Sequence, residues 1–147
     1  MTIEQLIDGV IDSLHTEFGD GYQYLTDNNE QDLPAPCFIV KVPYAARQLF
    51  FDRRYHRDFM VTITYFPTAS PVGAVGELEA ELNNTADRML VTMEFITANG
   101  HKIHSYDKTA EKSDGCLVFN MSFDLYEIVQ NDVELMQHQD TVIIAKE

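Results

Sequence analysis

The sequence predicts an α+β fold with a mostly antiparallel sheet of about five strands and two helices packed mainly on one face. Only two segments show the spacing of apolar residues that is typical of helices, whereas several others alternate like strands. The elements follow in the order helix, three strands, helix, two or three strands, without an internal repeat. Two helices cannot cover both faces of such a sheet, so both are expected on one face of a single domain spanning residues 1–147.

The first helix is predicted over Thr2 to Glu17. Thr2 followed by Gln5 three positions later matches a capping box, and the glycines at 19 and 21 supply the backbone freedom that ends a helix. The prediction rests on apolar residues that recur at spacings of three and four: Ile3, Leu6, Ile7, Val10, Ile11, Leu14 and Phe18.

Three strands are predicted next, at residues 22–27, 37–42 and 58–67. The first two are rich in β-branched and aromatic residues and are separated by a polar loop that contains proline. The third alternates Phe59, Val61, Ile63 and Tyr65 with Met60, Thr62, Thr64 and Phe66. Pro67 ends it because proline cannot donate a hydrogen bond to a neighbouring strand.

A second helix is predicted from about Glu77 to Met93, after a flexible connection at 68–76. The remainder predicts a strand meander. Its turn signals are Asn99-Gly100 and the segment 111–115, and its strands are residues 101–108 and 116–129. An acidic tail is expected from about residue 130.

The charge balance excludes several classes of protein. With 24 acidic and 10 basic residues, the formal net charge is −14, which argues against duplex DNA or anionic lipid bound over a broad face. No run approaches the ~20 apolar residues that cross a bilayer, and the N-terminus lacks the features of a signal peptide. We therefore expect a soluble cytosolic product with two free thiols, Cys37 and Cys116, and no membrane partner.

The search for catalytic chemistry is negative. Motifs for a nucleophile elbow, a phosphate-binding loop, a zinc protease or a dinucleotide site are absent. His101 and His104 lie three apart in a predicted strand, so their side chains are expected on opposite faces. Asp8 and Asp12 share a helix face, which is better explained by solvation than by acid–base catalysis. We predict no catalytic residue, no metal site and no cofactor.

Arginine is concentrated in one stretch of the chain. Four of the ten cationic residues lie within positions 47–57, whereas the first forty residues contain neither lysine nor arginine. Aromatic residues accompany them, a composition enriched in protein interfaces and their hot spots. The arginines could instead pair with the chain's own acidic helices or form a solvated loop. The candidate interface residues are Arg47, Phe50, Phe51, Arg53, Arg54, Tyr55 and Arg57.

The order of these segments resembles the phage tail terminator family found in prophages of Gram-positive bacteria. The likeness is carried by the run at 54–57, the alternating strand that follows and its Tyr65-Phe66-Pro67 end. An N-terminal amphipathic helix, a strand after a proline loop, a helix after the third strand, and the segment "SDGCLVFNMSFDLYE" occur in the same order over nearly the whole chain.

The resemblance implies a non-enzymatic protein of the virion tail. Proteins of this family are expected to form rings, commonly hexamers, on the end of the tail tube, to stop its polymerisation and to join it to the head connector. The implied partners are further copies of this chain, the tail tube protein and the head–tail connector, with DNA passing through an acidic lumen without specific binding. Alternatives are another head–tail joining or tail completion protein, or, in a different class, a small acidic enzyme or ligand-binding domain.

Overall fold

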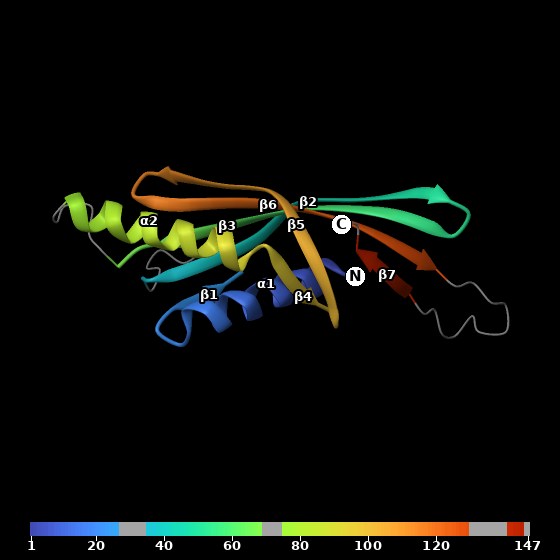
Figure 1. The fold of residues 1–147 in the computed structure, drawn as a ribbon, viewed down its shortest axis with the longest axis horizontal. Coiled ribbons are helices and arrows are strands. Elements are labelled where there is room, and N and C mark those ends of the chain that lie inside the picture. The colour runs from blue at the N-terminus through green and yellow to red at the C-terminus, as the bar shows by residue number, and fades with distance from the viewer. Residues whose placement is uncertain (27–34, 69–74, 130–140, 146–147) are drawn as a thin grey trace.

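The computed structural model describes residues 1–26, 35–68, 75–129 and 141–145, which form an α+β fold (Figure 1). The predicted loop residues 28–34, the connection at 69–74 and the predicted tail, apart from 141–145, lie outside the described residues. The elements are α1 (Ile3–Phe18), β1 (Gln23–Leu25), β2 (Cys37–Phe51), β3 (Arg54–Phe66), α2 (Val75–Thr92), β4 (Phe95–Ala98), β5 (His101–Ser113), β6 (Cys116–Val129) and β7 (Thr141–Ala145).

The sheet is curled, mixed and larger than predicted. Six strands follow one another in the order β1-β2-β3-β6-β5-β4, and β7 pairs with β6 off this path. The β1–β2 pair is parallel, and the other pairs are antiparallel. The expectation of about five strands is therefore too low. The missed strands, β4 and β7, have 4 and 5 residues, too few to show a clear alternation.

The first helix begins and ends as the sequence predicts. The hydroxyl of Thr2 accepts a hydrogen bond from the backbone N–H of Gln5 at 3.1 Å, and the Gln5 side chain accepts one from the backbone N–H of Thr2 at 2.8 Å. These reciprocal bonds satisfy two backbone donors that the first turn leaves without helical partners. The helix ends at Phe18, before Gly19 with a φ of 83°.

One hydrophobic core joins both helices to one face of the sheet. The inward side chains of β3 are Phe59, Val61, Ile63 and Tyr65, which alternate with partly or fully exposed residues. The Tyr65 hydroxyl donates to the Glu81 carboxylate at 2.7 Å, and burial together with this contact raises the pKa of Tyr65. The helices contribute Leu6, Ile7, Val10, Leu14 and Phe18 from α1, and Leu82 and Met89 from α2.

Two tight turns connect β4 to β5 and β5 to β6. Asn99 and Gly100 have φ angles of 52° and 77°, and Asp114 and Gly115 have 51° and 77°. Left-handed conformations at both positions are typical of two-residue hairpins. The turn predicted at 111–115 is thus confined to its last two residues, and β5 is longer than the predicted strand at 101–108. Among the described residues, no helix combines the length and apolarity that a bilayer crossing demands.

Substitution of Gly9 tests the packing of α1 against the sheet. A Cβ at this position would lie 2.7 Å from the Thr97 carbonyl oxygen and 2.8 Å from the Ala98 Cβ. We expect Gly9→Ala to lower the free energy of unfolding by about 2 kcal/mol, because overpacking outweighs the gain in helix propensity. Gly76→Ala is the control, since its Cβ would meet nothing within 4 Å. Chemical denaturation of both variants measures the difference; equal stability would contradict the packing.

Candidate functional site

The arginine-rich stretch forms the far end of a long β-hairpin. In Figure 1, β2 and β3 extend together beyond both helices, and we call residues 44–57 the arm. The two strands pair as far as Phe51 and Arg54, and Asp52 at the turn has a φ of 54°. On its other side β3 pairs with β6 along its length, up to Ile128. The arm is therefore a continuation of the sheet.

The outer edge of β2 is exposed along the arm. β1 pairs with β2 only at residues 37–39, and within the described part of the chain no other strand pairs with that edge. A register shift lies between Lys41 and Tyr44, around Pro43. Exposed edge strands present unpaired backbone N–H and C=O groups and are templates for pairing with another chain.

Large apolar side chains cluster near the tip of the arm. The exposed fraction is 58% for Leu49, 64% for Phe50 and 67% for Phe51. Tyr44, at the base of the arm, is 54% exposed. Single exposed apolar residues are ordinary on a protein surface, but a contiguous group on an unpaired edge is typical of an interaction site. The tip is therefore the main candidate for a contact with another protein.

The apolar surface continues from the tip onto β6. The ring of Phe50 lies edge-on to that of Tyr126, with centroids 5.6 Å apart. A surface hollow of ≈ 310 Å³ is lined by Phe50, Arg54, Tyr126 and Ile128. A second hollow of ≈ 380 Å³ shares Phe50 and Tyr126 and also includes Gln48, Leu49 and His56. Aromatic, aliphatic and cationic groups are thus available together for a partner.

Three of the four arginines in the arm reach solvent. The guanidinium of Arg47 stacks 3.8 Å from the Tyr55 ring, and the Arg47 side chain is 48% exposed. The Arg53 side chain is 52% exposed and lies 3.9 Å from the Asp52 carboxylate. Arg54 is exposed at the rim of the first hollow. Such guanidinium groups can stack on aromatic rings and can bind a carboxylate through two parallel hydrogen bonds.

Arg57 differs from the other three because its side chain is only 14% exposed and is hydrogen-bonded to the buried carboxylate of Glu127. Its Nη1 donates to Glu127 Oε1 at 3.1 Å and to the Met1 carbonyl at 2.9 Å, and its guanidinium covers the Phe59 ring at 4.6 Å. Glu127 is only 3% exposed and also lies 3.0 Å from the Met1 amino group. The contacts of Arg57 are those of a buried structural pair, so the interface prediction rests on the other six residues.

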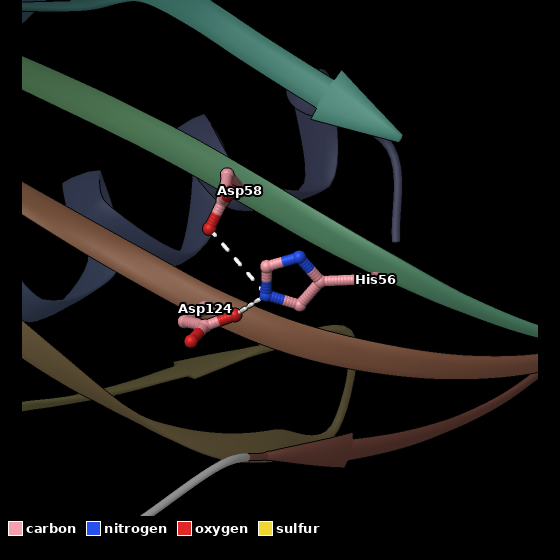
Figure 2. A group of neighbouring side chains, drawn as sticks. All are labelled: His56, Asp58 and Asp124. Carbon is pink, nitrogen blue, oxygen red and sulfur yellow. Dashed lines mark hydrogen bonds and ion pairs between the residues drawn. The ribbon is translucent and has the colours of Figure 1, made fainter. Parts of the chain in front are cut away.

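A further cluster lies at the base of the arm. His56 and Asp58 on β3 and Asp124 on β6 converge on the sheet face opposite the helices, as Figure 2 shows. His56 Nε2 contacts Asp124 Oδ1 and lies 3.6 Å from Asp58 Oδ1. The sequence analysis missed this group, although His-x-Asp within a predicted strand places both side chains on one face. Only the pairing of β3 with β6 supplies the third member.

Several other residues considered in the sequence have contacts within the fold or are buried in it. His104 lies 2.7 Å from the Glu94 carboxylate. Burial raises the pKa of the thiols of Cys37 and Cys116, which disfavours the reactive thiolate. Three acidic side chains on the helices have intramolecular contacts: Glu17 with Arg88, Glu79 with Lys112, and Glu81 with Tyr65.

Comparison with known proteins assigns the chain to a family. The family described as "Phage tail terminator protein" matches residues 5–134. The chain belongs to this family. A search of curated proteins finds no match. A solved structure whose title names no function has 14% identity, covers 85% of this chain and 96% of its own, and has a TM-score of 0.31. A likeness of this size carries no argument about fold or function.

Family membership confirms the resemblance read from the sequence. The chain is a phage tail assembly protein and a component of the virion tail, in a structural, non-enzymatic family. The match runs from Gln5 to residue 134, so it includes the whole arm, α1 from Gln5 onward, α2 and strands β1 to β6.

Proposed function

We propose that the chain forms a ring on the end of the tail tube, stops polymerisation of the tube and joins it to the head connector. The ring is a hexamer in this proposal, as the resemblance implies. The observation that supports it best is the arm, which combines an exposed strand edge with a contiguous apolar tip.

The geometry of the arm suits a contact between neighbouring subunits. A ring closes only through heterologous contacts, in which one surface of a subunit binds a different surface of the next. The exposed edge of β2 can serve as one of these two surfaces, with a different part of the neighbouring subunit as the other. Exposed hydrophobic edges normally promote aggregation, so an edge of this kind is best explained by a partner that covers it.

Charge complementarity favours an acidic partner for the tip. Arg47, Arg53 and Arg54 are exposed on the arm, whereas the chain as a whole carries a net charge of −14. A second copy of the chain therefore supplies abundant carboxylates for these guanidinium groups. The tail tube end is the other partner that the proposal places next to the arm.

The acidic helix faces are the proposed lining of the DNA channel. Asp8, Asp12 and Asp87 are exposed on α1 and α2. Negative charge at the lumen would repel phosphates and keep DNA from adhering as it passes. Several other carboxylates on the helices are paired with arginine, lysine or tyrosine. This part of the proposal therefore rests on the three exposed aspartates.

Removal of the protein from assembling tails tests the proposed function. Electron microscopy of phage particles made without this chain should show tail tubes of abnormal length that carry no heads. Complementation with the wild-type chain should restore uniform tails, and purified complexes should contain a ring by native mass spectrometry. Tubes of normal length that fail only to bind heads would assign the chain to head–tail joining and exclude termination.

A further inference from the structure

We infer that His56, Asp58 and Asp124 form a binding site for one divalent transition-metal ion, of which Zn²⁺ is the best-suited example. The inference does not depend on whether the chain forms the proposed ring. It lies on the sheet face opposite the helices, where the arm begins (Figure 2).

The spacing of the three side chains fits a single ion. Their ligand atoms all lie within 4.8 Å of one another, and His56 Nε2 is 3.6 Å from Asp58 Oδ1. Zinc binds nitrogen and oxygen ligands at about 2.1 Å, so two ligands of a tetrahedral ion lie about 3.4 Å apart. Small rotations of the side chains would bring all three donors to one ion.

The hydrogen-bonding capacity of His56 favours a cation at this point. Both carboxylates approach the same imidazole nitrogen, Nε2, as the dashed lines in Figure 2 show. A neutral imidazole carries at most one proton on that nitrogen, so it can donate fully to only one of them. An ion bound to Nε2 would interact with both carboxylates at once.

The positions of the two aspartates also favour a bound cation. Asp58 and Asp124 are direct partners in the β3–β6 ladder, so their side chains stand side by side on one face. Like charges directly opposite each other weaken a strand pair. A divalent ion would remove this repulsion and cross-link β3 to β6 where the arm leaves the helices.

The chemistry of the donors selects the class of ion. An imidazole nitrogen with two carboxylates suits zinc and similar transition metals, whereas Mg²⁺ and Ca²⁺ prefer all-oxygen sites. The side chains of His56, Asp58 and Asp124 are 25%, 35% and 16% exposed, which leaves room for a water molecule as a fourth ligand.

Calorimetric titration of the untagged, chelator-treated chain with Zn²⁺ tests the site. We expect one ion per chain and a melting temperature that rises with Zn²⁺, with no comparable effect of Mg²⁺ or Ca²⁺. His56→Gln and Asp124→Asn should each weaken binding at least about 100-fold, since even the loss of an outer-shell partner costs 10- to 100-fold. His104→Gln is the matched control, because it removes a strand histidine that contacts a carboxylate away from the site.

Two outcomes would overturn the inference. One is the absence of stoichiometric Zn²⁺ binding to the wild-type chain; the other is binding that keeps its wild-type affinity in both His56→Gln and Asp124→Asn. If a variant fails to fold, a measurement on the wild-type chain still tests the site. In ¹H–¹⁵N NMR spectra, Zn²⁺ should shift amide signals around residues 56–58 and 124; shifts centred on the cysteines would place the ion elsewhere.

Discussion

Phe50→Ser combined with Phe51→Ser is expected to abolish the proposed assembly while leaving the subunit folded. The two side chains are 64% and 67% exposed, so their loss should change the free energy of unfolding by less than about 1 kcal/mol. An aromatic hot-spot residue that is buried in an interface typically contributes about 2 kcal/mol or more to the binding free energy. The double variant should therefore weaken association by roughly 1000-fold.

Val91→Ser is the matched control for the tip variant. Val91 is 77% exposed on α2, so its substitution removes a similar type of surface away from the arm. Thermal unfolding, native mass spectrometry of the ring and electron microscopy of complemented tails give the three readouts. Normal rings and tails of uniform length with the double variant would show that the tip is not part of the contact.

Arg57→Ala is expected to destabilise the subunit itself, by about 3 kcal/mol. Loss of the arginine side chain leaves Glu127 with a buried charge and fewer hydrogen bonds. Such a change typically lowers the free energy of unfolding by about 3–5 kcal/mol. We place the effect at the lower end because the Met1 amino group, at 3.0 Å, and Arg47, at 4.0 Å, remain near the carboxylate. For a chain of this size the melting temperature should fall by roughly 6–12 °C.

Two further substitutions separate this structural role from a role in the interface. Arg53→Ala removes an arginine that is 52% exposed and should cost under about 1 kcal/mol. Arg57→Lys keeps a positive charge beside Glu127 and should recover part of the stability. If Arg57→Ala left the melting temperature unchanged but prevented assembly, Arg57 would belong to the interface with the other arm residues.

The sequence predicts the helices, β6 and the core half of β3 well because their signals are local. It was wrong on the bounds of the arm: β2, predicted at 37–42, runs to Phe51, and β3, predicted from 58, begins at Arg54. The capping box at Thr2 and Gln5, the alternation from Phe59 to Tyr65 and the Asn99-Gly100 turn each depend on neighbouring residues alone. The same alternation, extended by one step, also places Arg57 on the core side of β3. That signal was available in the sequence, but the cluster of arginines suggested a solvent-exposed segment instead.

The sequence by itself determined the class of fold, the family and the unusual segment at 47–57. Strand pairing decided where the residues of that segment lie and which of them are exposed. The register that joins Asp58 to Asp124 brings together residues 66 positions apart, and the contact of Arg57 with Glu127 spans 70. Such contacts depend on which strands become neighbours and in which register, and local propensity carries no information about either. The exposure of the β2 edge is likewise decided by how far β1 extends along it, which only the tertiary structure shows.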